Sequence, residues 1–174
     1  ELRVSGTSGT TAAVNVGDDI GVNLFILGNG ESITGSAVFL EFDDSYLELV
    51  PAATLPNGTI RPFSAGRYLQ GTVFRNSTLD DRIGNSNANR IPLFQLFYNE
   101  DIPGGFSGQQ RAAVGDGILA SFTVRVIRKP EGLTTAVRVV GNSPTGSESG
   151  YFNRGDPGNV YSFRSIKNLS ITVQ

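Results

Sequence analysis

Carboxylates are the main side chains of this sequence that could act as general acids or bases, because its 174 residues include no His and no Cys. A Ser-His-Asp triad, a thiolate nucleophile and the usual zinc ligands are thereby excluded. Four pairs of adjacent carboxylates remain: Asp18–Asp19, Asp43–Asp44, Asp80–Asp81 and Glu100–Asp101. Neighbours in a strand point to opposite faces, whereas glycoside hydrolysis needs two carboxyl groups about 5–10 Å apart across a cleft. We interpret the pairs as turn caps and solvated charges, and we predict that the protein is not an enzyme.

Residues 76–90 form a polar segment whose oxygen atoms could bind calcium. Ca²⁺ accepts carboxylate and amide oxygens and tolerates a flexible loop. The spacing differs from that of an EF-hand loop, since no Gly and Glu follow in the required register. The main interpretation is therefore a polar loop without a ligand, and no firm cofactor is predicted. The calcium candidates are Asp80, Asp81, Asn85 and Asn87.

Aromatic side chains accompany a second long polar segment, residues 141–158. Carbohydrate modules usually stack the apolar face of a sugar on an exposed aromatic ring. The sequence contains no Trp, so a platform for a polysaccharide would consist of Tyr151, Phe152 and Tyr161. The alternative interpretation is that these rings anchor the segment to the rest of the domain.

The charges of the sequence are few and scattered. Fourteen basic and 16 acidic residues give a net charge of −2, and they form no basic block. We therefore expect no nucleic-acid partner. No apolar run reaches the ~18 residues of a membrane span, so no membrane insertion is expected. A polar surface built from Ser, Thr, Asn and Gly is common in extracellular β modules, which predicts an extracellular or cell-surface location.

The chain length and the identity of the first residue indicate how the domain is organised. A chain of 174 residues is expected to form one domain. The first residue is Glu rather than Met. We therefore expect residues 1–174 to be a single module excised from a longer chain.

Apolar residues at every second position dominate the pattern of the sequence. It is clearest in residues 20–26, 38–42, 118–126 and 169–173. This period is typical of strands with one buried face, and clusters of Gly, Pro and Asn separate the strands as turns. No long stretch has helical periodicity. The pattern predicts an all-β fold, an antiparallel β-sandwich with about nine or more strands.

Three segments stand in a characteristic order: VNVGDDIGVNLFIL (14–27), GSAVFLEFDDSYLELV (35–50) and GDGILASFTVRV (115–126). Their order resembles that of cohesin modules, the receptor domains of cellulosome scaffoldins. One departure is Asp44, where the family motif has Pro. The resemblance implies a jelly-roll β-sandwich, a fold that some carbohydrate-binding modules share.

The resemblance also implies a dockerin-like protein partner, held on one flat sheet face. The strands of that face would be residues 34–42, 67–75, 91–99 and 118–127. Apolar side chains beside charges at the outward positions would form a protein-binding patch. The alternative for the apolar residues is that a loop covers them. The expected partner-binding residues are Phe39, Glu41, Leu119, Ser121, Thr123 and Arg125.

Three functions therefore remain open at this stage. The first is a non-catalytic extracellular module of cohesin type that binds a dockerin-like partner. The second is a carbohydrate-binding module on the same scaffold, and the third is a structural spacer in a large surface protein. An apolar-centred patch on a flat sheet favours the first, and a row of exposed Tyr or Phe rings favours the second.

Overall fold

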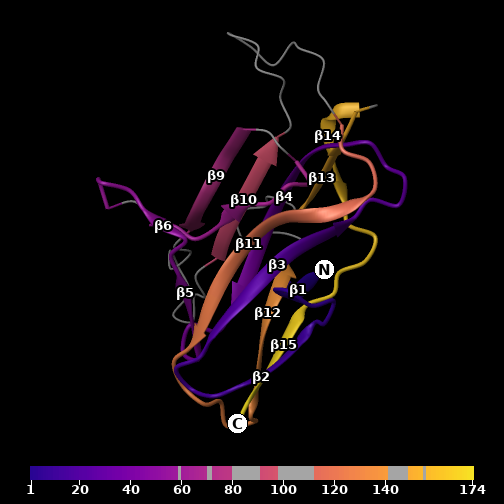
Figure 1. Ribbon diagram of the computed structural model, residues 1–174. Helices are drawn as coiled ribbons and strands as arrows, with labels where there is room; N and C mark the ends of the chain where they lie inside the picture. The colour runs from indigo at the N-terminus through magenta and orange to yellow at the C-terminus, as the bar shows by residue number, and fades with distance from the viewer. Residues whose placement is uncertain (59, 70–71, 80–90, 98–111, 141–148, 155) are drawn as a thin grey trace, which may run out of the picture.

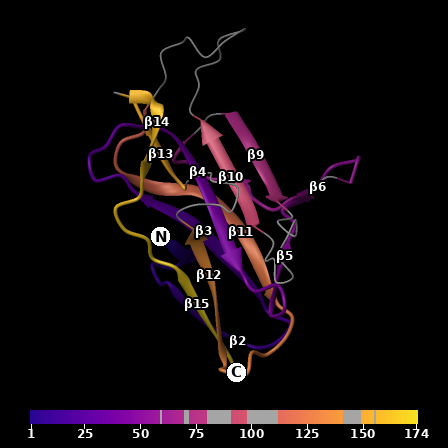
Figure 2. The ribbon, with the colours of Figure 1, turned by 180° about the vertical axis from the view of Figure 1, so that it is seen from behind.

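Two β-sheets pack face to face in the computed structural model (Figure 1). The structure describes the chain except residues 59, 70–71, 80–90, 98–111, 141–148 and 155. In Figure 1 the strands β3 and β11 lie in front of β4 and β12, and the reverse view in Figure 2 brings β4 and β12 forward. The predicted all-β sandwich is confirmed, and the described residues contain no helix.

The first sheet, called the β3–β11 sheet below, has five strands in the order β1-β3-β11-β5, with β8 also paired to β11. All of its pairs are antiparallel. Its strands are β1 (Leu2–Val4), β3 (Asp19–Leu27), β11 (Asp116–Val126), β5 (Leu47–Val50) and β8 (Ser64–Ala65).

The second sheet, called the β4–β12 sheet, has eight strands in the order β14-β13-β4-β12-β15-β2, with β10 between β4 and β9. Successive segments of one edge of β4 pair with β13 and with β12. Strands β15 and β2 pair in parallel, whereas an antiparallel sandwich was expected. Its strands are β14 (Asp156–Ser162), β13 (Gly150–Asn153), β4 (Ile33–Phe42), β12 (Thr134–Val140), β15 (Leu169–Val173), β2 (Thr11–Val14), β10 (Ile91–Phe97) and β9 (Thr72–Leu79).

A small hairpin projects from the sandwich beside β5 (Figure 1). It consists of β6 (Ala53–Thr54) and β7 (Ile60–Arg61), which pair only with each other. In the described part of the chain there is no helix long and apolar enough to span a membrane.

The predicted alternation accounts for the core between the sheets. On β3 the even-numbered residues are buried and the odd-numbered ones are partly exposed, as expected for a strand with one face covered. Strand β15 alternates in the same way. The largest fully buried side chains come from both sheets and from their connections: Leu2, Ile33, Leu40, Leu47, Leu69, Leu119, Leu169, Ile171, Val22 and Val124.

A β-bulge interrupts the alternation in β11. Ile118 pairs with Phe25 and Ala120 pairs with Leu24, so Leu119 is an extra residue on this strand. A bulge of this kind turns the side chains on one side of it to the opposite face. Leu119 therefore joins the core cluster, whereas Ile118 does not.

Candidate functional site

The strands expected to form the partner face do not all lie in one sheet. Strands β4, β9 and β10 are hydrogen-bonded neighbours in the β4–β12 sheet, as expected. Strand β11 pairs with β3 and β5 in the opposite sheet, so the expectation that residues 118–127 belong to this face is wrong. Strand β4 pairs with β12 instead, and the alternating apolar residues of β12 pack in the core between the sheets.

The outer face of the β4–β12 sheet is the candidate functional surface. We define it by the residues of β4, β12, β15 and β2 that point away from the core. Arg138 stands opposite Glu41, and Val140 stands opposite Phe39. The remainder of the face consists of small side chains in register across three strands: Ala136, Ser170, Thr11, Thr172 and Ala13.

Phe39 lies on β4, at one border of this face, but is not presented to solvent. It alternates with core residues of β4, and it is not part of the core cluster. Even so, only 4% of it is exposed. Its backbone N–H donates to Oγ of Ser149 at 2.9 Å, and Ser149 is itself buried. The expectation that Phe39 is an exposed contact is therefore wrong, and its burial agrees with the alternative that the ring is covered.

Leu119 was expected beside Phe39 at the centre of the same patch, and this expectation is also wrong. Leu119 is 2% exposed and packs in the core, on the opposite sheet. The bulge is the physical reason, because it turns this residue inward. Glu41 is half-buried on the outer face of the β4–β12 sheet and has bonding partners there.

Ser121, Thr123 and Arg125 do lie on an outer face, but it is that of the β3–β11 sheet. Ser121 Oγ donates to Oδ1 of Asn23 at 2.8 Å. Arg125 makes a two-pronged ion pair with Asp19, at 2.7 and 3.0 Å. The hydrogen bonds from this guanidinium lower the pKa of Asp19 and raise that of Arg125. Ser121 and Arg125 therefore bond to side chains of the neighbouring strand β3.

The outer face includes three residues that are not among the expected partner-binding residues: Arg138, Val140 and Ala136. The alternation in residues 134–140 could have found them, because Val137 and Val139 pack toward the core and the residues between must point outward. What the pattern could not supply was the position of β12 next to β4.

The three aromatic residues suggested for sugar binding do not form an exposed platform. Tyr151 is 9% exposed and belongs to the core cluster. Tyr161 is 36% exposed and stacks on Tyr151, with ring centroids 5.6 Å apart. Phe163 also stacks on Tyr151, with ring centroids 6.2 Å apart. Phe152 is half-buried. The structure thus favours the alternative interpretation, in which the rings anchor this edge of the sandwich.

The calcium candidates lie outside the described residues. Asp80, Asp81, Asn85 and Asn87 all fall in the range 80–90. Within the described ranges, no group of three or more acidic side chains could hold a metal ion. Calcium binding stays an untested expectation.

The fold is a jelly-roll β-sandwich similar to that of cohesin modules, which confirms the fold expected from the resemblance. No protein-family model matches the sequence, and no curated protein matches it. A type II cohesin domain from the cellulosome of Acetivibrio cellulolyticus is 14% identical, with a TM-score of 0.58 over 98% of this chain and 94% of that one. A type I cohesin–dockerin complex from Clostridium thermocellum gives 11% identity and a TM-score of 0.58 over 100% and 98%.

A third similar structure is a type III cohesin module of the cell-surface anchoring scaffoldin ScaE from Ruminococcus flavefaciens. It is 15% identical, with a TM-score of 0.56 over 100% of this chain and 88% of that one. At this level of identity the likeness concerns the fold, because one fold supports many binding functions.

Proposed function

We propose that this protein is a non-catalytic binding module that holds a dockerin-like protein on the outer face of its β4–β12 sheet. The observation that carries the proposal is the fold, which is similar over nearly its full length to cohesins solved in complex with dockerins. The cellulosomal and cell-surface origin of similar modules supports an extracellular or cell-surface location.

The arrangement of the sheet supports the choice of this face. Four strands, β4, β12, β15 and β2, form a continuous hydrogen-bonded surface with small side chains. The side chains of Thr11, Ser170 and Thr172 are exposed and lose little conformational entropy when a partner covers them. Arg138 adds an exposed charge near the middle of the surface.

The opposite face is a less suitable binding surface. On the β3–β11 sheet, Arg125 already pairs with Asp19 and lies 3.5 Å from Glu48. A partner that covered Arg125 and Asp19 would have to displace their water. It could not offer these side chains better hydrogen bonds than those they already make with each other. This contrast also provides a control, since Arg138 lies on one face and Arg125 on the other.

The proposal is tested by charge reversal on the two faces. Binding is measured by calorimetry with a panel of dockerin modules that includes those of the Acetivibrio cellulolyticus and Clostridium thermocellum complexes. We expect Arg138→Glu to weaken binding by at least about tenfold, because it places a second negative charge beside Glu41 at the interface. Arg125→Glu on the other face should change the affinity by less than about threefold.

Other outcomes separate the alternatives. Equal losses in the two variants, or a loss only in Arg125→Glu, would contradict the assignment of the face. Retention of the module on insoluble polysaccharide, with no dockerin bound, would support the carbohydrate-binding function. Binding to neither would support a structural spacer. Release of reducing sugar beyond the amount of protein would show that the module is an enzyme, against our expectation.

A further inference from the structure

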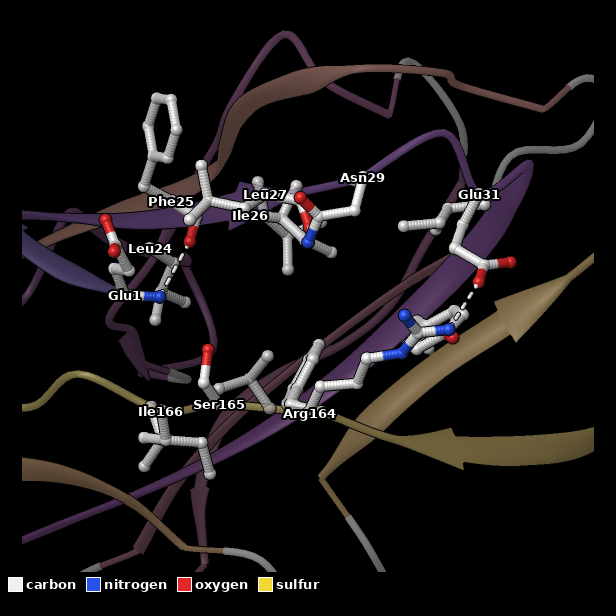
Figure 3. A pocket seen from close by; sticks show the side chains of 17 residues that line it. Glu1, Leu24, Phe25, Ile26, Leu27, Asn29, Glu31, Arg164, Ser165 and Ile166 are labelled. Carbon is white, nitrogen blue, oxygen red and sulfur yellow. Dashed lines mark hydrogen bonds and ion pairs between the residues drawn. The ribbon is translucent and has the colours of Figure 1, made fainter.

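A cleft opens between the two sheets where β3 ends (Figure 3). On one side of it lies β3 from Leu24 to Leu27, and on the other side lies the coil of residues 163–166. The cavity volume is about 90 Å³. The cleft lies at an edge of the sandwich, away from the outer face of the β4–β12 sheet.

The cleft exists because the edges of the sheets do not close over each other here. Strand β1 has three residues and pairs with β3 only as far as Leu24. On the other sheet, β14 ends at Ser162 and β15 begins at Leu169, so a coil rather than a strand crosses the opening. The interior between these two borders is left partly unfilled.

Apolar side chains of both sheets form the interior of the cleft. Val38 and Leu119 lie on opposite sheets and both belong to the core cluster. Tyr151 and Phe163 add two stacked aromatic rings to the lining, with an angle of 29° between their planes. An enclosed cavity of about 150 Å³ lined by Leu, Ile and Phe binds benzene. The apolar interior of this cleft, although open at its mouth, favours the apolar part of a ligand in the same way.

The mouth of the cleft combines apolar and charged side chains. Leu27 of β3 and Ile166 of the coil lie on its two borders, and each is 38% exposed. At the end of the cleft farther from Ile166, Arg164 donates to one oxygen of Glu31 at 3.2 Å, and Asn153 donates to the other at 2.8 Å (Figure 3). Glu31 is thus a hydrogen-bond acceptor with a fixed position at the entrance, because both of its oxygens are held.

We propose that this cleft binds a small molecule with a single aromatic ring and a hydroxyl group, such as a phenol. The cavity volume of about 90 Å³, continuous with the open mouth, leaves room for no more than one ring and is too small for a long acyl chain. The ring would contact Tyr151 and Phe163 in an offset or edge-on arrangement. The hydroxyl would remain at the mouth and donate to the carboxylate of Glu31, because hydrogen bonds to a charged acceptor are stronger than those to a neutral one. This site is independent of the proposed protein-binding face.

The test uses the intact 174-residue chain and 4-fluorophenol as the probe, followed by fluorine NMR. We expect saturable binding with a dissociation constant of about 1 mM, which corresponds to about −4 kcal/mol. Fluorobenzene, which lacks the hydroxyl, should bind at least about threefold more weakly. Glu31→Gln, which removes the charged acceptor, should reduce this difference between the two probes.

A matched pair of variants locates the site. Ile166→Trp should fill the mouth and weaken 4-fluorophenol binding by at least about tenfold, because the larger ring occupies the volume of the ligand. Ile127→Trp is the control: Ile127 is 41% exposed and follows the far end of β11, so the affinity should change by less than about twofold. Thermal melting of each variant checks that the fold is retained.

If Ile166→Trp fails to fold, NOE measurements on the unmodified protein still locate the site. Proton NOEs from phenol to the rings of Tyr151 and Phe163 should appear. A response that rises linearly without saturation up to about 10 mM probe would overturn the proposal. Equal effects of the two Trp variants, or NOEs only to residues outside the cleft, would also overturn it.

Discussion

At the scale of single residues, Tyr68 has an unusual environment. Its hydroxyl is the only buried side-chain polar atom of the described residues that has no hydrogen-bond partner. The ring packs so closely on Gly117 that a Cβ there would lie 2.8 Å from it. Burial, with a smaller contribution from the negative charge of Asp116, raises the pKa of Tyr68 to about 12. The folded protein therefore strongly favours the neutral phenol.

The first residue-scale prediction follows from this pKa. In the unfolded chain Tyr68 releases its proton near pH 10, whereas in the folded protein it retains the proton up to about pH 12. The free energy of unfolding should therefore fall as the pH rises between these values. Tyr68→Phe should remove this part of the alkaline destabilisation. At pH 7 it should leave the stability unchanged or raise it by up to ~1 kcal/mol, because no hydrogen bond is lost.

Urea unfolding at pH 7, 10 and 11.5 measures the effect. Tyr161→Phe is a suitable control, since the Tyr161 ring is 36% exposed. A loss of stability at pH 7 in Tyr68→Phe would show that the hydroxyl has a hydrogen-bond partner in solution. Parallel alkaline curves in the parent chain and in this variant would show that the pKa of Tyr68 is not raised in the folded protein.

At the scale of elements, the bulge in β11 is held by the segment that follows β8. The N–H of Gly66 donates to the carbonyl oxygen of Leu119 at 2.8 Å, and that of Tyr68 donates to the carbonyl of Ile118 at 3.0 Å. The segment approaches so closely that a Cβ at position 66 would overlap the carbonyl oxygen of Ile118. Only glycine permits this contact between backbones.

Gly66→Ala should therefore destabilise the protein by ~2 kcal/mol, since backbone must shift to accept the methyl group. For a domain of this size such a change lowers the melting temperature by roughly 4–8 °C. Gly132→Ala is the control, because a Cβ at Gly132 meets no atom within 4 Å, and it should change stability by less than about 0.5 kcal/mol. Equal melting temperatures of the two variants, measured by calorimetry, would exclude the proposed role of the glycine.

The bulge in β11 also shows which features of the strands the sequence does not predict. Alternation correctly predicts which residues of β3 and β15 face inward, because that pattern depends on the strand alone. It cannot reveal that Leu119 turns inward, since the bulge depends on two residues of β11 facing one of β3. Nor does it assign β11 to a sheet. For the same reason the candidate face was only partly predicted: Glu41 lies on it, whereas Ser121, Thr123 and Arg125 lie on the other sheet.

At the scale of the whole molecule, one carboxylate joins the two sheets. Glu1 precedes β1 of the β3–β11 sheet, and Lys167 precedes β15 of the β4–β12 sheet. Lys167 Nζ lies 2.7 Å from one oxygen of Glu1, and Arg3 lies 2.6 Å from the other. The backbone of Leu2 also donates to the carbonyl of Lys167 at 2.8 Å. This side of the sandwich is thereby fixed by charge as well as by apolar packing.

Acid should weaken this connection in a narrow pH range. The hydrogen bond from Lys167, with that from Arg3, lowers the pKa of Glu1 from 4.5 to about 2 in the folded protein. A lowered folded-state pKa means that the stabilisation is complete above pH 4.5 and is lost as the pH falls toward 2.

Glu1→Gln removes the charge at every pH. We therefore expect it to be less stable than the parent chain at pH 7, with a difference that shrinks toward zero near pH 2. Urea unfolding at pH 7, 4.5 and 2.5 measures this convergence, with the exposed carboxylate Glu131, changed to Gln, as the control. A difference between Glu1→Gln and the parent chain that stays constant over this range would mean that Glu1 contributes by packing and not by its charge, and that the two sheets are held on this side by the backbone hydrogen bond of Leu2.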